Sequence, residues 1–297
     1  HWFEGTLNLL FPEPHASLAA GLLTGSRRGL PAGLLADFTA VGLTHIIAIS
    51  GTNITIIMTL IAGLLFWLPF RWRLIPTIFA ITAFTFFVGA SASVVRAAIM
   101  GSLGLLAVTL GRQADTRLAI LWTAAAMTFW NPARLWWDGG FQLSFAAVIG
   151  LTELTPILQP LLHAIPKTLG LRESLLTTIA AQLTAMPLTI LLFGNLSIIA
   201  PIANVLVAPV IPIAMLFGAV SVAAGALWIP LGKLVALPGW MCLSWIVGVA
   251  QTLARVPGAS FHFERASVIL LMLYYIILAG IVLCFRKIPI WNLQKSS

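Results

Sequence analysis

The chain consists of long apolar runs separated by short connections that hold most of its polar residues. A helix needs about 20 apolar residues to cross the roughly 30 Å of hydrocarbon in a membrane, so we interpret the runs as membrane-spanning helices. They cover residues 44–68, 74–90, 92–110, 117–130, 140–158, 174–193, 197–227, 234–254 and 267–285. The pattern predicts an all-α polytopic integral membrane protein with about nine spans.

The N-terminal segment, residues 1–43, has a different pattern. Its apolar runs at 14–24 and 31–42 are too short to cross a membrane, which predicts interfacial or re-entrant helices on the outer side. The chain has no internal repeat and no low-complexity linker, so we expect one transmembrane domain over 44–286 and a tail at 287–297. It begins without methionine or a signal peptide, which indicates a piece of a longer protein.

The composition excludes a water-soluble enzyme and a disordered chain. Hydrophobic residues make up 60% of the sequence and charged residues 8%, and the mean hydropathy is +1.04. Soluble domains carry about 25% charged residues. Both cysteines, Cys242 and Cys284, lie in apolar runs, so a disulfide framework is excluded as well.

The basic residues set the predicted orientation. The net charge of +8 would suggest nucleic-acid binding in a soluble protein, but in a membrane protein it follows from the positive-inside rule. The connections on one side of the membrane hold Arg71, Arg73, Arg112, Arg117, Lys167, Arg172, Lys233, Arg286, Lys287 and Lys295. Those on the other side hold Arg27, Arg28, Arg134, Arg255 and Arg265. The richer side faces the cytoplasm, so we expect the N-terminus outside the cytoplasmic (inner) membrane and the tail inside the cell.

Polar residues open the first predicted span, where they are costly unless they face protein or water. They are His45, Ser50 and Asn53, together with Gly51. On a helix, His45 and Asn53 fall within about 80° of each other. These residues are candidates to line a polar path, and the alternative is hydrogen bonding between closely packed helices.

Two further spans carry polar candidates. Arg96 is a cation within the third run, which marks a functional site unless the side chain snorkels toward the outer interface. Asp138, Gln142 and Ser144 begin the fifth run, directly after tryptophans typical of an interfacial belt. The alternative role of Asp138 is to cap the following helix.

The seventh run contains Pro201, Pro209 and Pro212, with Asn204 among them. Each proline inside a helix removes a backbone hydrogen bond, so an unbroken helix is not expected. Such a segment is typical of a re-entrant or pore-lining element, although a kinked packing helix fits as well. The proline-rich segment also fits an alternative function, a small-molecule or ion transporter with a midplane site near Asn204.

Motifs for metal and nucleotide chemistry are absent from the sequence. It has no His-Glu-x-x-His motif, no cysteine pair, no carboxylate cluster and no phosphate-binding loop. We therefore expect no catalytic residue, no metal and no cofactor. A weaker alternative is an intramembrane serine hydrolase with Ser50 as nucleophile and His45 or another histidine as base.

Four separated stretches together resemble the competence domain of the ComEC family of DNA-uptake channels. They are residues 42–51 (GLTHIIAISG), 95–100 (VRAAIM), 131–145 (NPARLWWDGGFQLSF) and 185–209. Asn53 departs from the family, which often has a histidine at that place.

The resemblance implies a membrane channel that passes one DNA strand into the cytoplasm during natural transformation. It also implies a helicase-like ATPase motor in the cytoplasm and an outer DNA-binding module or receptor as partners. Full-length members carry an OB-type domain and a nuclease-like module. Because single-stranded DNA needs cations for its phosphates and tolerates apolar walls, the polar residues above become candidates for its path. The path candidates are His45, Ser50, Gly51, Asn53, Arg96, Asp138, Gln142, Ser144 and Asn204, with Arg27 and Arg28 at the outer mouth.

Overall fold

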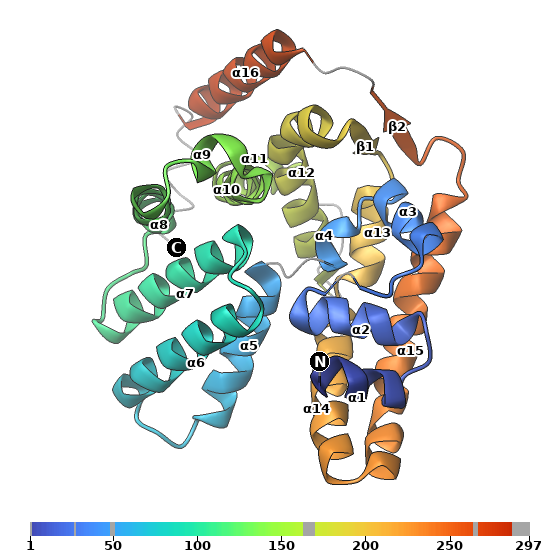
Figure 1. The fold of residues 1–297 in the computed structure, drawn as a ribbon. Coiled ribbons are helices and arrows are strands. Elements are labelled where there is room, and N and C mark those ends of the chain that lie inside the picture. The colour runs from blue at the N-terminus through green and yellow to red at the C-terminus, as the bar shows by residue number, and fades with distance from the viewer. Residues whose placement is uncertain (1, 27, 48–50, 163–169, 264–266, 287–297) are drawn as a thin grey trace.

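The structure is a computed structural model that describes residues 2–26, 28–47, 51–162, 170–263 and 267–286. These residues are almost entirely helical, and the sheet among them consists of two short strands. The predicted all-α class is therefore confirmed. The helices form two groups that stand side by side (Figure 1), joined through α12 (Leu171–Phe193).

One group, the hairpin lobe, combines the N-terminal segment with helices from the C-terminal half of the chain. Its members are α1 (Trp2–Leu10), α2 (His15–Thr24), α3 (Ala32–Ala40), α4 (Thr44–Ile47), α13 (Ala200–Val207), α14 (Ile211–Leu227) and α15 (Ile229–Ala254). The helices α14 and α15 form a hairpin, and α1, α2 and α3 pack against it. Leu7, Phe38 and Leu243 are fully buried in the continuous core between them.

The helices of the N-terminal segment are short, as predicted, but α2 does not lie on a surface. Every residue of α2 from Ala16 to Leu23 is buried. This stretch is almost entirely alanine, leucine and glycine, and a helix without a polar face packs inside protein. The N-terminal segment is thus part of the core of the hairpin lobe.

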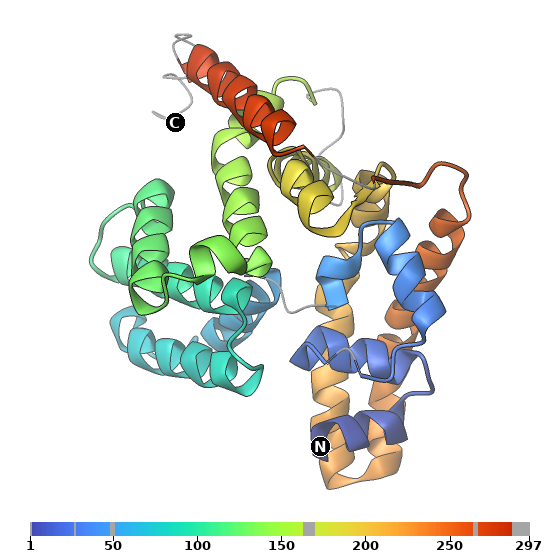
Figure 2. The same cartoon turned by 45° about the horizontal axis from the view of Figure 1, so that its top comes forward.

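The other group, the short-helix lobe, comes from the middle of the chain. Its members are α5 (Gly51–Leu64), the 3-10 turn η1 (Phe70–Arg73), α6 (Leu74–Phe87), α7 (Ala92–Thr109), α8 (Thr116–Trp130), α9 (Arg134–Trp137) and α10 (Gly139–Glu153). The helix α7 contacts α5, α6, α8 and α10, so it organises the lobe. Figure 2 shows the same separation of the two lobes from a second direction.

The chain passes from the short-helix lobe through α11 (Thr155–Leu158) into α12, which packs on both α10 and α13. After α12, β1 (Asn195–Ser197) pairs antiparallel with β2 (Ser260–His262). The last described helix, α16 (Val268–Arg286), follows β2 and contacts α12.

The helix α12 continues through Pro187 because a neighbouring helix replaces a missing hydrogen bond. Proline has no N–H, so the carbonyl of Leu183 lacks its donor within the helix. The hydroxyl of Tyr274 on α16 donates to this carbonyl at 2.8 Å, and the adjacent Tyr275 donates to the carbonyl of Thr184 at 2.7 Å. Two neighbouring tyrosines thus attach α16 to the proline turn of α12.

Length and composition identify four described helices able to cross a membrane, namely α7, α12, α15 and α16. The helices α13 and α14 meet at 47° and make a fifth span if they are taken together. This bend confirms the predicted break in the proline-rich segment. The prediction of nine spans is not confirmed, because α5, α6, α8 and α10 have only 14 or 15 residues each.

Candidate functional site

Arg96 lies near the start of α7, at a point where three helices of the short-helix lobe meet. Its side chain is buried, with 7% of its surface exposed. The Nη1 atom donates to the carbonyl oxygen of Ser144 on α10 at 2.9 Å, and the guanidinium carbon lies 6.0 Å from the centre of the Phe145 ring. A Cβ added to Gly51 on α5 would lie 3.1 Å from Nη2. Gly51 is therefore the residue that lets the guanidinium approach α5.

No acidic side chain pairs with Arg96 among the described residues. Its Nε atom has no hydrogen-bond partner in that part of the chain, and Ser144 contributes a neutral carbonyl. An arginine side chain keeps its charge in proteins, and a buried charge is costly until it is paired. The junction of α5, α7 and α10 therefore holds a positive charge that an anion would stabilise.

Asn53 lies two residues after Gly51 on α5 and joins the two lobes. Its side chain is buried, and Nδ2 donates to the carbonyl of Leu22 at 3.0 Å. Leu22 is in the last turn of α2, where carbonyls have no partner within the helix. This contact places Asn53 at a joint between α2 and α5, beside the Arg96 junction.

The other candidates at the start of α10 bond to nearby backbone. The carboxylate of Asp138 accepts the Phe141 N–H at 3.0 Å. Asp138 therefore caps the N-terminus of α10, which is the alternative to a role in a polar path. Gln142 donates to the carbonyls of Leu135 and Trp136, so it holds α9 against α10. Asp138 and Gln142 therefore fix the helix that presents the Ser144 carbonyl to Arg96.

Three further candidates, His45, Asn204 and Arg28, do not join this junction. His45 is exposed on α4, and its Nδ1 lies 3.0 Å from the Gly42 carbonyl. Asn204 is half-buried on α13 in the hairpin lobe, and Arg28 lies in an exposed turn. Arg27 and Ser50 lie outside the described residues.

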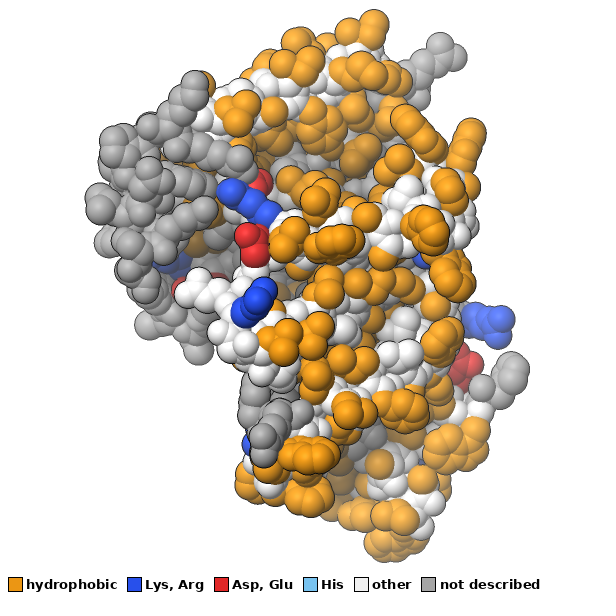
Figure 3. Space-filling model, turned by 90° about the vertical axis from the view of Figure 1, so that its left-hand side faces the viewer, with side chains coloured by type: hydrophobic (Ala, Val, Ile, Leu, Met, Phe, Trp, Pro, Cys, Tyr) orange, Lys and Arg blue, Asp and Glu red, His pale blue; other side chains and the backbone are white. Residues whose placement is uncertain are grey.

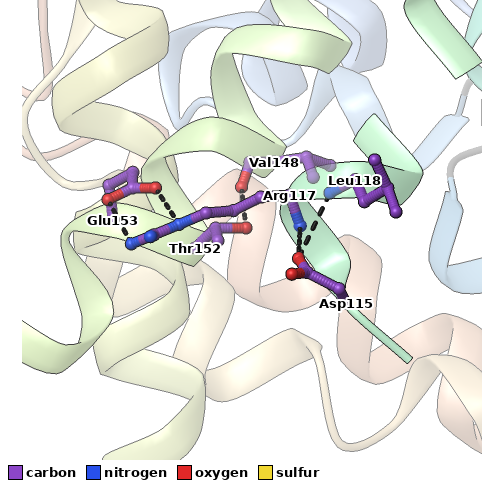
Figure 4. A network of polar contacts seen from close by, with 6 residues as sticks. All are labelled: Asp115, Arg117, Leu118, Val148, Thr152 and Glu153. Carbon is purple, nitrogen blue, oxygen red and sulfur yellow. Dashed lines mark hydrogen bonds and ion pairs between the residues drawn. The ribbon is translucent and has the colours of Figure 1, made fainter. Parts of the chain in front are cut away.

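The short-helix lobe also contains an ion pair, which is shown in Figure 4. Arg117 at the start of α8 meets Glu153 at the end of α10, with Nε 2.8 Å from Oε1. Asp115 caps α8 by accepting the N–H groups of Arg117 and Leu118. This pair fastens the ends of α8 and α10 that lie away from Trp130 and Asp138.

Two buried side chains were not expected from the sequence. Phe145 follows Ser144 in an apolar run, which gives no sign of its contact with Arg96. The sequence pattern places Arg172 in a connection, whereas its side chain is 5% exposed and its Nη2 donates to the Gln159 carbonyl at 2.7 Å. Its place directly at the start of an apolar run is the signal that could have revealed its burial.

Within the described ranges, no three histidine, cysteine, aspartate or glutamate side chains gather where they could hold a metal ion. The serine-hydrolase alternative depends on Ser50 and so on a position outside those ranges. Among the described residues at the Arg96 junction, the buried cation donates to a carbonyl group, and no nucleophile is hydrogen-bonded to a base there.

Comparisons with known proteins identify the family. A profile described as Competence protein matches residues 22–288. The chain is similar to ComE operon protein 3 of Bacillus subtilis (strain 168), with 27% identity over 290 residues. That match covers 94% of this chain and 36% of the relative, so the chain spans about a third of the relative's length. No solved structure matches. The chain is a multi-pass membrane protein that belongs to the Competence protein family.

Proposed function

We propose that this chain forms the membrane-embedded path by which single-stranded DNA crosses the bacterial cytoplasmic membrane during natural transformation. Membership of the Competence protein family supports a role in DNA uptake. The apolar helices support a site within the membrane. Since the chain matches about a third of its relative, it acts as one part of a longer protein.

The observation that carries the proposal is the charge of Arg96. Each nucleotide that passes brings one phosphate, and a buried cation with no acidic partner among the described residues provides the countercharge such a group needs. The Phe145 ring beside the guanidinium offers an apolar face of the kind that single-stranded nucleic acid tolerates.

The proposal includes nine crossings, with the N-terminus outside and the C-terminal tail in the cytoplasm. This arrangement requires α5, α6, α8 and α10 to cross in addition to the longer helices. The charge asymmetry of the connections supports the orientation.

DNA import also requires a source of energy. Moving each phosphate toward a negative interior costs about 2.3 kcal/mol per 100 mV, so the membrane potential opposes uptake. The sequence has no phosphate-binding loop, and we propose that a cytoplasmic helicase-like ATPase pulls the strand. An outer DNA-binding module or receptor would deliver it. We assign no catalytic activity to this chain.

A small-molecule or ion transporter is the second candidate. The bend of 47° between α13 and α14 favours it, because broken helices form midplane sites in many transporters. Two hollows of about 260 and 320 Å³ lie beside α13, and they share Leu206. Their walls are mostly apolar, with Ser244 and Thr252 as the polar side chains of the larger hollow, and such walls suit neither an ion nor a polar solute.

The test is uptake of labelled DNA in a transformable strain complemented with the full-length protein. Arg96→Ala should lower uptake per membrane-inserted protein at least tenfold, since the phosphate loses its countercharge. Arg172→Ala is the matched control for position, because Arg172 is also buried, donates to a carbonyl and has an Nε atom without a partner among the described residues, but lies at the start of α12 and not at the Arg96 junction. Normal uptake by Arg96→Ala at normal abundance would refute the assignment, and normal DNA uptake in a strain that lacks this chain would favour the transporter.

A further inference from the structure

The strand β2, in the connection between α15 and α16, has one open edge. The N–H of Phe263 donates to the carbonyl of Gly194 at 2.8 Å, which continues the pairing with β1 by one residue. In an antiparallel pair such bonds occur at every second residue, so the N–H and carbonyl groups of Ser260 and His262 point away from β1. Among the described residues, no hydrogen bond to these groups takes the place of a third strand.

The other strand, β1, is fixed to the body of the protein. The Gln182 side chain on α12 donates to the Ser197 carbonyl at 2.9 Å and so occupies the opposite edge of the sheet. Asn195 is buried, and its Nδ2 donates to the Thr39 carbonyl on α3 at 3.1 Å. A two-stranded sheet alone is at best marginally stable in water. These contacts therefore hold β1 in place, and with it the open edge of β2.

One face of this sheet is apolar and exposed. Side chains alternate between the two faces of a strand, so Phe261 and Phe263 share a face with Leu196 and Ile198 of the neighbouring strand. Phe261 is 48% exposed, Phe263 43% and Ile198 59%. Asn195, on the other face, is buried. The sheet thus packs on the protein with its polar face and presents its apolar face to the surroundings.

Lipid tails do not suit this sheet, although they suit the exposed apolar helices. Figure 3 looks onto the side of the short-helix lobe and shows hydrophobic side chains over most of the face, with few charged groups. The backbone groups of helices are paired within each helix, whereas an open sheet edge is not tolerated against lipid hydrocarbon. The open edge of β2 therefore faces water or protein. An exposed apolar face in such a place is typical of a protein interaction site.

We infer that β2 accepts a third, extended strand from the part of the longer protein that lies outside this chain. The open edge supplies backbone hydrogen bonds, and the apolar face beside Phe261 selects a strand with apolar side chains at alternate positions. A peptide fits this edge better than DNA does, because the edge offers donors and acceptors in turn, whereas the DNA backbone presents phosphate oxygens, which only accept.

The length of the relative favours a strand from the same polypeptide. The chain spans about a third of the relative's length, so most of a protein of that length lies outside it. A tethered segment has an effective concentration in the millimolar range when its linker is short and flexible, which favours it over a second copy. In the proposed orientation the connection between α15 and α16 is outside the membrane, so the strand comes from an outer segment. The inference does not require DNA transport.

Photo-crosslinking in the full-length protein tests this inference. The photoreactive amino acid p-benzoylphenylalanine replaces Phe261, whose ring it extends, and the membranes are then irradiated. We expect a cross-link within one polypeptide, which mass spectrometry maps to an extended segment outside residues 1–297. The same probe in place of Ile277, an exposed residue in the middle of α16, is the control and should react with lipid.

A proline at the open edge separates strand pairing from other contacts. His262→Pro removes an N–H from the open edge and none from the pairing with β1, and proline is tolerated on edge strands. The cross-link yield should fall at least about fivefold, because a backbone hydrogen bond is lost and the proline ring obstructs the incoming strand. His262→Ala keeps the N–H and should keep the yield. Equal losses in the two variants would contradict strand pairing.

The product of the Phe261 probe decides the nature of the partner. A cross-link to a second copy, to labelled single-stranded DNA or to lipid alone would overturn the inference, as would no product when the Ile277 probe reacts. Uptake by Arg96→Ala tests the proposed function separately. Normal uptake by that variant together with the expected cross-link would refute the role of Arg96 and leave the third strand in place.

Discussion

At the scale of single residues, the position of Arg96 depends on a residue with no side chain. An alanine at Gly51 would place its Cβ 3.1 Å from Nη2 of Arg96, closer than ordinary van der Waals contact. Gly51→Ala should therefore displace the guanidinium while leaving its charge in the protein. We expect DNA uptake to fall at least threefold with little change in protein abundance.

Gly63 provides the matched control for this substitution. It lies in the same helix, and an added Cβ would meet no atom within 4 Å. Gly63→Ala should keep normal uptake and slightly stabilise α5, since alanine favours helix by about 1 kcal/mol over glycine. Equal uptake by the two variants would show that the close approach of Gly51 to Arg96 has no functional role.

At the scale of elements, the contact of α16 with the proline turn of α12 predicts that the energetic effects of substitutions at Tyr274 and Pro187 are coupled. Tyr274→Phe leaves the Leu183 carbonyl without a donor, because Pro187 cannot supply one. The loss should lower the free energy of unfolding by about 1 kcal/mol, measured in detergent or bicelles. In a Pro187→Ala background the effect of Tyr274→Phe should shrink, because the new N–H at position 187 can bond to the Leu183 carbonyl.

Tyr275 is the internal control of this cycle. Its hydroxyl donates to the Thr184 carbonyl, whose helical donor is the N–H of Leu188 and does not involve position 187. Tyr275→Phe should therefore have the same effect with either residue at 187. A cost of Tyr274→Phe that is independent of Pro187 would contradict the proposed reason for this contact.

The elements themselves could largely be predicted from the apolar pattern. The run at 92–110 became α7, and the run at 174–193 became most of α12. The run at 44–68 predicts a single span, whereas its described residues form two separate helices, α4 and α5. A window of average hydrophobicity does not register such a division, whereas the prolines near Asn204 marked the α13–α14 bend directly.

At the scale of the whole molecule, less could be predicted, because the decisive contacts join positions that are far apart in the sequence. Arg96 and Ser144 are 48 residues apart, and Asn53 and Leu22 are 31 apart. Neither separation follows a helical period, so a single sequence cannot reveal the pairs. The sequence pattern identifies the polar residues as candidates. Which of them meets Arg96, which caps α10 and which connects α5 to α2 follows only from the packing of the helices.

Because several helices of the short-helix lobe are short, the number of membrane crossings is a prediction to be tested. Cysteines placed in the connections between these helices can test it. Pro69, Ser91, Gln113 and Asn131 are exposed and lie between α5, α6, α7, α8 and α10 in turn. If every one of these helices crosses, single cysteines there should alternate between the two faces of the membrane. The positive-inside rule places Pro69 and Gln113 in the cytoplasm.

Impermeant maleimide applied to spheroplasts should thus label Ser91→Cys and Asn131→Cys, and label Pro69→Cys and Gln113→Cys only after the membrane is opened. The background carries Cys242→Ala and Cys284→Ala. The pair of Ser91 and Gln113 is an internal control, because α7 between them is long enough to span by itself. Labelling of Pro69→Cys from the same face as Ser91→Cys would mean that α6 does not cross. The short-helix lobe would then be re-entrant, and the nine-span arrangement would have to be abandoned.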